Sequence, residues 1–186
     1  RSAAPAVRTH RARRVIGVAT SRYLIALGSN VPHPRHGRPE RVLAAALIAL
    51  EQAGLAVDRA APVMRSRPVG PSRRAYANGA ALVATPLPPP DLLHLLKQVE
   101  RSFGRKRGGQ RWGARVLDLD IVLWSGGKWV SPGLSIPHRL FRDRAFVLTP
   151  TARIAPGWRD PDTAHTLRQL NARLTRRHSL PKRHPR

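Results

Sequence analysis

The chain has 186 residues, which is enough for one domain with a substantial core and short for two. It contains no cysteine, so disulfide bonds and thiolate metal sites are excluded, and no apolar run is long enough to span a bilayer. A formal net charge of +24 at pH 7 indicates a polyanionic partner, such as a nucleotide, a nucleic acid or an anionic lipid, or else a compositional bias toward arginine.

Both ends of the chain are basic. Residues 1–20 carry five arginines and no acid, which loosely fits an organellar transit peptide, but their apolar stretch is too short for a secretory signal. We expect residues 1–20 to be a disordered extension, residues 21–175 to form a single domain, and residues 176–186 to be a disordered tail. A chain without cysteine suits a reducing compartment, so a cytoplasmic location is expected.

The first predicted elements are a strand and a helix. The apolar run YLIAL at residues 23–27 ends at the turn sequence Gly28-Ser29-Asn30, as is typical of a short strand. Residues 39–53 have apolar side chains at helical spacing, with a proline in the first turn and Gly54 suited to the C′ position.

Two further strands are predicted next, with a loop between them. Residues 55–66 have the composition of a strand that Pro62 interrupts, and residues 76–85 have that of another strand. The segment between them, residues 67–75, is rich in proline and arginine and is expected to be a loop.

A second helix is predicted after the run Pro88-Pro89-Pro90-Asp91. Asp91 suits the N-cap, because its carboxylate can accept hydrogen bonds from the first free backbone N–H groups, and Gly104 suits the C-terminal end. The apolar face consists of Leu92, Leu95, Leu96, Val99 and Phe103. A glycine- and arginine-rich loop follows over residues 104–115.

The remaining elements complete a recognisable order. Residues 117–124 are expected to be a strand, residues 136–150 a turn with one helical turn and a last short strand, and residues 166–174 a terminal helix. The order of strands and helices is that of a split βαβ unit. The expected fold class is therefore α+β, with a ferredoxin-like βαββαβ core and a mainly antiparallel sheet covered by helices.

The most informative stretch is RWGARVLDLDIVLW, residues 111–124, which places two aspartates inside an apolar run. Burial of a carboxylate is costly unless it is paired, and side chains of a strand alternate between two faces. One face is expected to carry Leu117, Leu119, Ile121 and Leu123, and the other Asp118, Asp120, Val122 and Trp124. The two carboxylates are thus predicted to lie side by side, at a margin of the sheet.

Such a pair of carboxylates needs a cation. Like charges a few ångströms apart repel and raise each other's pKa unless a cation lies between them. Magnesium favours hard oxygen ligands, and two magnesium ions could share the pair while holding a polyphosphate. The alternative is that each aspartate pairs with a nearby arginine, and the short motif alone does not decide between the two interpretations.

The loop before this strand favours the polyphosphate interpretation. Its cations are Arg105, Lys106, Arg107, Arg111 and Arg115, and its glycines are expected to make it mobile. A flexible cationic loop beside a metal-binding carboxylate pair suits the binding of a triphosphate. A merely solvated basic loop would leave the aspartates unexplained.

The same stretch closely resembles the signature of the 6-hydroxymethyl-7,8-dihydropterin pyrophosphokinase family of folate biosynthesis. Other segments resemble that family in the same order and with similar spacing, namely YLIALGSN (23–30), RSRPVGP (65–71), YAN (76–78) and IPH to RAF (136–146). The resemblance covers residues 23–158. It is more specific than any single motif, because several segments agree in order.

The resemblance implies that pyrophosphate is transferred from ATP to the hydroxymethyl group of the dihydropterin, with release of AMP. It implies that Asp118 and Asp120 hold two Mg²⁺ ions that bridge the triphosphate, and that the substrate hydroxyl attacks the β-phosphorus in line. Transfers of this kind depend mainly on positioning and charge neutralisation, so no protein base is required.

The residues carried over by the resemblance form three groups. The catalytic group is Arg105, Arg115, Asp118 and Asp120. The ATP-binding group is Glu100, Arg107, Trp112, Ile121, His138 and Arg144. The pterin-binding group is Ser66, Pro68, Val69, Tyr76, Asn78, Trp112 and Phe146. Within the last group, the amide of Asn78 would pair with the ring edge, and the rings of Tyr76 and Phe146 would sandwich the heterocycle.

The sequence departs from the family pattern at two positions, because Arg139 stands where tyrosine is common and Ala114 where proline is common. An inactive family member is disfavoured by the retained Asp118, Asp120 and Arg115. We expect a monomer that binds ATP and the dihydropterin and no membrane.

The main alternative is a small basic RNA-binding protein of the same ferredoxin-like fold. The net charge favours it, but the strand over residues 76–84 offers a single aromatic side chain for base stacking. It would also leave Asp118 and Asp120 unexplained. Nucleic acid is therefore not a required partner, and weak non-specific binding is assigned to the basic ends.

Overall fold

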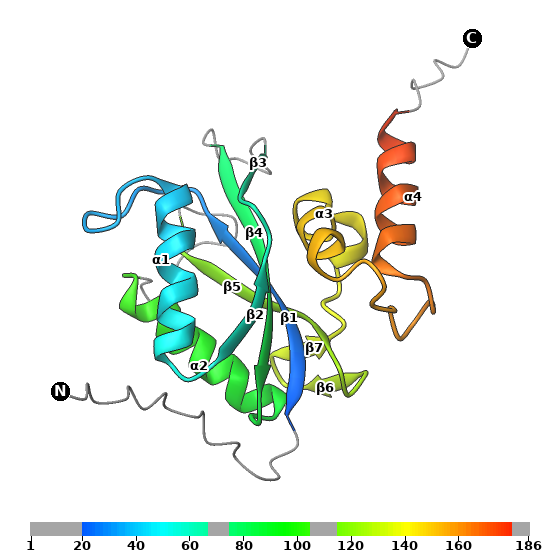
Figure 1. Ribbon diagram of the computed structural model, residues 1–186, viewed down its shortest axis with the longest axis horizontal. Coiled ribbons are helices and arrows are strands. Elements are labelled where there is room, and N and C mark those ends of the chain that lie inside the picture. Colours follow the sequence, from blue (N-terminus) through cyan, green and yellow to red (C-terminus); the bar gives the residue numbers. More distant parts are fainter. Residues whose placement is uncertain (1–19, 67–74, 105–114, 180–186) are drawn as a thin grey trace, which may run out of the picture.

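An antiparallel sheet with helices on both faces forms the centre of the molecule (Figure 1). A computed structural model of the chain describes residues 20–66, 75–104 and 115–179. The strands of the sheet are β1 (Ser21–Ser29), β2 (Ala56–Ala60), β3 (Met64–Ser66), β4 (Tyr76–Thr85) and β5 (Asp118–Trp124). Their order is β2-β4-β1-β5, β3 also pairs with β4, and β5 lies at an edge.

This strand order confirms the expected ferredoxin-like α+β fold. The strand predicted over residues 55–66 is divided as expected, into β2 and β3 on either side of Pro62, and both parts pair with β4. All pairings in the sheet are antiparallel. The central strand β1 therefore has β4 on one side and β5 on the other.

Helices α1 (Pro39–Gln52) and α2 (Pro89–Ser102) cover one face of the sheet (Figure 1). Alternation along β1 points Tyr23, Ile25 and Leu27 to this face. They form the first hydrophobic core together with Val42, Leu43, Ala46 and Leu50 of α1, Leu92, Leu96 and Val99 of α2, and Leu117, Leu119 and Ile121 near β5.

The two helix ends follow the glycine signals in the sequence, whereas one predicted cap is wrong. Gly54 and Gly104 have φ angles of 91° and 83° at the C′ positions, a left-handed conformation that glycine adopts without a Cβ penalty. Asp91 is not the N-cap of α2, because the helix begins at Pro89 and Pro88 occupies that position. Proline lacks an N–H and has a helix-compatible φ, so the helix can start within the proline run.

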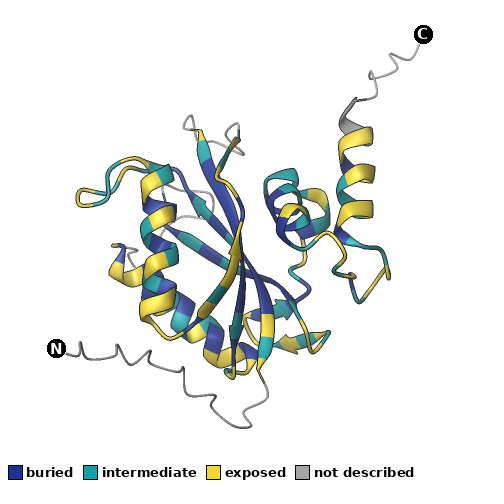
Figure 2. Cartoon of the chain, in the orientation of Figure 1, coloured by how far each residue is buried: buried dark blue, intermediate teal, exposed yellow. Residues whose placement is uncertain are grey.

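The opposite face of the sheet is covered by α3 (Ala145–Ile154), and α4 (Leu167–Ser179) packs on α3 (Figure 1). The second hydrophobic core lies here and contains Leu24, Ala80, Leu82, Val122, Leu123, Phe141, Val147, Leu148, Ile154, Leu167 and Leu174. Figure 2 shows buried residues between the layers and exposed residues along the outer side of α4. No described helix has both the length and the apolar character to cross a membrane.

The segment from residue 136 to 150 differs from its prediction. The expected last strand is wrong, because the chain forms the short helix η1 (Phe141–Asp143) and then α3, in spite of Pro150 inside α3. Helical winding places Val147, Leu148, Thr151 and Ile154 on one buried face against the sheet. The terminal helix was predicted to end at Leu174 but continues to Ser179, so residues 176–179 belong to a helix and not to a tail. The hairpin of β6 (Trp129–Ser131) and β7 (Leu134–Ile136) was not predicted.

A β-bulge in β5 changes which face its last residues occupy. Leu24 is opposite Leu123 and Ile25 is opposite Ile121, so Val122 is an extra residue in β5. A shift of one residue moves every later side chain to the other face. Leu123 therefore lies in the second core, and Trp124 stacks on Tyr23 in the first, with ring centroids 6.2 Å apart. The predicted faces of these two residues are wrong, whereas Asp118 and Asp120 precede the bulge and keep theirs.

Candidate active site

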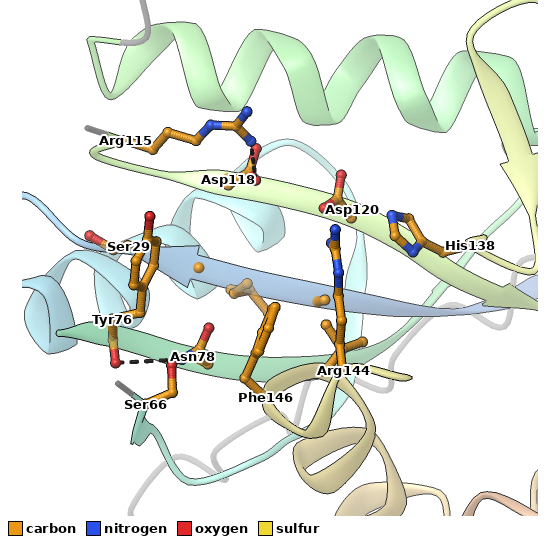
Figure 3. A pocket seen from close by; sticks show the side chains of 14 residues that line it. Ser29, Ser66, Tyr76, Asn78, Arg115, Asp118, Asp120, His138, Arg144 and Phe146 are labelled. Carbon is orange, nitrogen blue, oxygen red and sulfur yellow. Dashed lines mark hydrogen bonds and ion pairs between the residues drawn. The ribbon is translucent and has the colours of Figure 1, made fainter. Parts of the chain in front are cut away.

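A cavity of about 270 Å³ opens on the α3 side of the sheet. Its lining comes from β1, the ends of β3 to β5, the segment around His138, and the start of α3 (Figure 3). The lining residues are Ala26, Leu27, Gly28, Ser29, Ser66, Tyr76, Asn78, Arg115, Asp118, Asp120, His138, Arg144, Phe146 and Val147. Most of the site residues predicted in the described part of the chain are thus brought together in one place.

The strand register explains how polar groups from distant segments converge here. Gly28 of β1 is opposite Asn78 on β4 and also opposite Asp118 on β5. Two residues earlier, Ala26 is opposite Asp120. Because β1 contributes only a hydrogen atom and a methyl group at these two positions, the cavity is open above β1. The polar side chains of β4 and β5 border this floor on its two sides (Figure 3).

The acidic border contains an ion pair. Nη1 of Arg115 lies 2.5 Å from Oδ2 of Asp118. Desolvation raises the pKa of Asp120, and the neighbouring Asp118 raises it further, while His138, Lys97 and Arg115 oppose the shift. Arg115 thus pairs with Asp118, as the arginine interpretation predicts, whereas the charge of Asp120 is only partly compensated.

His138 borders the same end of the cavity from a connecting segment. Its backbone N–H donates to the carbonyl of Val122 at 3.0 Å, so the bulge of β5 anchors this histidine. Its Nδ1 accepts the N–H of Leu140 at 3.3 Å, which places the proton of the neutral ring on Nε2. Desolvation lowers the pKa of His138, although Asp120 opposes the shift, so the ring is neutral near pH 7. The ring lies toward Asp120 in Figure 3.

The opposite border is built around the amide of Asn78, which is 4% exposed. Its Nδ2 donates to Oγ of Ser66 at 2.9 Å and to the carbonyl of Tyr76 at 3.4 Å. These two bonds use the donor side of the amide and fix its orientation, so the acceptor Oδ1 is directed to the cavity floor, 4.0 Å from where a Cβ on Gly28 would lie. The rings of Tyr76 and Phe146 flank this end of the cavity (Figure 3).

Two residues predicted to contact ATP, Glu100 and Ile121, do not line this cavity. The side chain of Glu100 is fully buried, where its Oε1 accepts the N–H of Leu119 at 2.8 Å and pairs with Nζ of Lys97 at 2.8 Å. Ile121 is packed in the first core. Glu100 supports β5 from α2 through its bond to Leu119, and Ile121 is a core residue of β5 itself.

Other predicted residues fall outside the described part of the chain. These are Arg105, Arg107, Trp112, Pro68 and Val69, together with the departure at Ala114. Arg139 is described and exposed, and it does not line the cavity. Arg144 does line it, and its guanidinium carbon lies 5.7 Å from the ring centroid of Phe146.

The sequence predictions missed the floor of the cavity. Ala26, Leu27, Gly28 and Ser29 of β1, together with Val147 of α3, line the cavity but were not proposed as site residues. The signal available was the turn sequence Gly28-Ser29 at the end of an apolar strand. A small residue opposite two functional side chains is visible only once the strand register is known.

Comparison with known proteins decides the family of the chain. The sequence model of the family described as 7,8-dihydro-6-hydroxymethylpterin-pyrophosphokinase matches residues 24–156. The chain belongs to this family. The resemblance inferred from the motifs and the predicted enzyme class, a pyrophosphokinase, are thereby confirmed.

Relatives named as members of the pyrophosphokinase family match most of the chain. A 2-amino-4-hydroxy-6-hydroxymethyldihydropteridine pyrophosphokinase of Pseudomonas aeruginosa is 40% identical over 146 residues, covering 77% of this chain and 86% of that protein. The enzyme of the same name from a Synechocystis strain is 37% identical over 147 residues, covering 79% of this chain and 73% of that protein.

The fold of this pyrophosphokinase family member is also found in solved structures. A crystal structure of Plasmodium falciparum HPPK-DHPS matches 87% of this chain with a TM-score of 0.68 and 13% sequence identity. The match spans 47% of the Plasmodium chain, so the chain described here corresponds to about half of that protein. At this identity the likeness establishes the architecture.

Proposed function

We propose that the chain transfers the pyrophosphoryl group of ATP to the hydroxymethyl group of 6-hydroxymethyl-7,8-dihydropterin and releases AMP, as a step of folate synthesis. The observation that carries the proposal is the row across the sheet that joins Asn78, Gly28 and Asp118. It sets an amide suited to a heterocycle edge and a carboxylate pair suited to a metal–polyphosphate at opposite borders of one cavity. A bisubstrate reaction requires such an arrangement.

The carboxylate border fits Mg²⁺, and we propose that Asp118 and Asp120 hold two of these ions. The fit rests on two hard oxygen donors facing one cavity and on the raised pKa of Asp120, which marks an incompletely compensated charge. Within the described residues, no cluster of three or more His, Asp or Glu side chains could hold a metal by itself. Water and phosphate oxygens would therefore complete the coordination, as is usual for Mg²⁺. When bound, the metal neutralises charge on the phosphate oxygens and lowers the pKa of a coordinated hydroxyl.

The cations beside this border would orient the triphosphate. The guanidinium of Arg115 can turn from Asp118 to a phosphate group, for which its planar fork is well suited. Arg144 enters the cavity from the start of α3. His138, neutral and carrying its proton on Nε2, can donate one hydrogen bond to a phosphate oxygen. Together these residues would hold the β-phosphorus in line with the attacking hydroxyl.

The other border would hold the pterin. Oδ1 of Asn78 accepts a hydrogen bond from a ring N–H, because the Nδ2 side of the amide is already bound to Ser66 and Tyr76. Aromatic rings stack favourably on a flat heterocycle, and Tyr76 and Phe146 flank this position. Arg105, Arg107, Trp112, Pro68 and Val69 remain part of the proposal through the family resemblance alone.

RNA binding on the sheet, as in other ferredoxin-like proteins, is less well supported. An RNA-binding sheet of this kind needs an open face with stacking aromatics. Here α1 and α2 pack on one face, and α3 packs on the other. Among the described residues, the cavity on the α3 side offers the rings of Tyr76 and Phe146, and the carboxylates of Asp118 and Asp120 at its border do not favour a nucleic-acid backbone.

The proposal is tested by measuring AMP formation from ATP in the presence of 6-hydroxymethyl-7,8-dihydropterin and Mg²⁺. We expect turnover by the intact chain, and a loss of about 100- to 1,000-fold in kcat for Asp118→Ala and for Asp120→Ala, because each removes charge that positions the transferring group. Chelation of Mg²⁺ should abolish turnover, and its addition should restore it.

A matched control is Asp58→Ala. Asp58 is an exposed aspartate on β2, 3.7 Å from the guanidinium of Arg22 and away from the cavity. We expect this variant to keep the turnover of the parent chain. Absence of AMP formation by folded protein would refute the activity, and undiminished turnover of both cavity variants would refute the role of the acid pair.

A further inference from the structure

Asn30, the residue that follows β1, is joined to Arg115 by hydrogen bonds in both directions. The backbone N–H of Arg115 donates to Oδ1 of Asn30 at 2.7 Å, and the backbone N–H of Asn30 donates to the carbonyl oxygen of Arg115 at 3.1 Å. Both backbone polar groups of Arg115 are therefore satisfied by one residue that lies 85 positions away in the sequence.

This pair of bonds replaces the next step of the β1–β5 ladder. The ladder ends with Gly28 opposite Asp118, and a regular continuation would place Asn30 opposite Val116. Asn30 bonds to Arg115 instead, and its side-chain oxygen accepts the hydrogen bond that a backbone carbonyl would accept in a ladder. The backbone at Arg115 thus depends on a side chain, which makes it sensitive to a single substitution.

The position of this backbone matters because of what the Arg115 side chain does. Its guanidinium pairs with Asp118 at 2.5 Å and lines the cavity. Arg115 lies before β5 begins at Asp118, so the strand ladder does not fix it. A long side chain reaches a defined point only if its Cα is held in place.

Burial supports a specific role for the oxygen of Asn30. The residue is 2% exposed, and its Nδ2 has no hydrogen-bond partner among the residues that the structure describes. A buried N–H donor without a hydrogen-bond partner is destabilising. Any stabilisation by the Asn30 amide therefore comes from Oδ1 and its bond to Arg115.

We propose that Asn30 is a positioning residue for pyrophosphoryl transfer. It holds the backbone of Arg115 at a place from which the guanidinium can reach both Asp118 and the triphosphate. The catalytic part of this inference rests on the proposed function. The attachment of Asn30 to Arg115 does not, so the two can be tested apart.

The catalytic part is tested by a double-mutant cycle of Asn30→Ala and Arg115→Ala, assayed at enzyme concentrations that keep slow variants measurable. In the parent chain, we expect Asn30→Ala to lower kcat about tenfold with little change in KM for the dihydropterin. In the Arg115→Ala background the same substitution should cost less than about twofold, because the side chain that Asn30 positions is gone. Equal losses in both backgrounds would overturn the inference and indicate a general structural role.

The matched control is Asn171→Ala. Oδ1 of Asn171 accepts the hydroxyl of Thr149 at 2.9 Å, which is likewise a bond between distant segments, but it joins α4 to α3 away from the cavity. It should lower the unfolding temperature as Asn30→Ala does and leave kcat unchanged. A similar loss of kcat in this control would show that loosening the fold is sufficient, and would contradict a positioning role.

The attachment itself is tested by hydrogen exchange of the Arg115 amide, measured by NMR. We expect Asn30→Ala to reduce its protection at least about tenfold and Asn30→Asp, which keeps an acceptor oxygen, to retain most of it. Unchanged protection in Asn30→Ala would overturn the inference whatever the activity. If the attachment is found but the parent chain forms no AMP, the proposed function fails, and with it the catalytic role.

Discussion

Arg115 donates to Asp118 across 2.5 Å, so a protein cation occupies a carboxylate that we propose as a ligand of Mg²⁺. We therefore expect Arg115→Ala to bind Mn²⁺ or Mg²⁺ alone more tightly, by about threefold to tenfold, because about 1 kcal/mol of competing attraction is removed. The same variant should bind the Mg²⁺–ATP complex more weakly, since a phosphate ligand is lost. Titration with Mn²⁺ by electron paramagnetic resonance and calorimetry with Mg²⁺–ATP measure the two affinities.

The control for this prediction is Arg22→Ala, which removes an exposed guanidinium 3.7 Å from Asp58. Neither affinity should change in the control. If Arg115→Ala weakened the binding of the metal alone as well as that of the nucleotide, Arg115 would be supporting the acid pair and not competing for it.

Gly28 is predicted to determine whether the two substrates fit together. A Cβ at this position would lie 4.0 Å from Oδ1 of Asn78 and from Cβ of Asp118, which is ordinary contact. Gly28→Ala should therefore fold with an unchanged or slightly raised unfolding temperature, because alanine costs less chain entropy than glycine. The added methyl group would occupy ligand space, and we expect the KM for the dihydropterin to rise about tenfold, which corresponds to about 1.4 kcal/mol.

Gly79→Ala is the matched substitution on the opposite face of the sheet, where a Cβ would lie 3.7 Å from Leu43 on α1. Steady-state kinetics of the two variants should differ, with Gly79→Ala close to the parent chain. If the kinetics of Gly28→Ala equalled those of the parent chain, the floor of the cavity would not be part of the substrate site.

The hydroxyl of Ser66 is predicted to orient the amide of Asn78. Without the 2.9 Å bond from Nδ2 to Oγ, the amide can rotate and present a donor where an acceptor is needed. We expect Ser66→Ala to raise the KM for the dihydropterin about threefold to tenfold and to leave the KM for ATP unchanged. Ser131→Ala, which removes the hydroxyl that accepts the indole N–H of Trp129 at 3.1 Å, should change neither constant. An equal rise in both KM values would point to a disturbed cavity and not to amide orientation.

The stability of the folded chain is predicted to fall in acid because of Asp160, which is fully buried. Burial raises the pKa of Asp160, but hydrogen bonds from Arg142, Thr163 and the backbone of Asp162 outweigh it, so the pKa is lowered overall. A depressed folded pKa stabilises the protein above the unfolded value of about 3.9. This contribution is lost as the pH falls through the lowered folded value.

Denaturant unfolding at a series of pH values from about 7 down to about 2 checks this prediction. Arg142→Ala leaves the buried carboxylate without its main partner, at 2.7 Å from Nε and 2.5 Å from Nη2, and should lower the free energy of unfolding at pH 7 by about 3 kcal/mol. Its stability should depend less on pH in the acid range. An unchanged acid dependence would show that other carboxylates dominate it.

The two basic ends are predicted to be dispensable for turnover. The lining residues of the cavity lie between Ala26 and Val147, so a chain of residues 20–179, which keeps α4 intact, should retain kcat and both KM values within about twofold. A large loss of rate would show that the ends belong to the catalytic unit. RNA titration at rising salt concentration should give an affinity that falls with salt in the full chain and is absent after truncation.

Local chemistry in the sequence accounts for the elements that were predicted correctly. Pro39 and Gly54 mark the ends of α1 because backbone preferences at helix termini depend only on nearby residues. Asp118 and Asp120 could be placed on one face because strand alternation is also local and both precede the bulge. The resemblance to the family signature added the prediction that these two aspartates belong to a polyphosphate site.

Contacts between segments that are distant in the sequence determined the features that the sequence did not predict. Residues 145–154 form a helix because the sheet provides an apolar face on which Val147 and Leu148 are buried, and no local preference reports that surface. The bulge at Val122 arises from the register between β1 and β5, and it reverses the faces of Leu123 and Trp124. A motif records a residue type and not the direction of its side chain, so the burial of the Glu100 carboxylate against Leu119 and Lys97 was not foreseen.

The sequence by itself determined the order of the elements up to β5, the two faces of β5 up to Asp120, and the family. Only the tertiary structure placed Gly28 between Asn78 and Asp118 and joined Asn30 to Arg115. These relationships connect residues up to 90 positions apart, as between Gly28 and Asp118. They depend on strand register and on packing between layers, because only the folded sheet brings such distant positions within hydrogen-bonding distance.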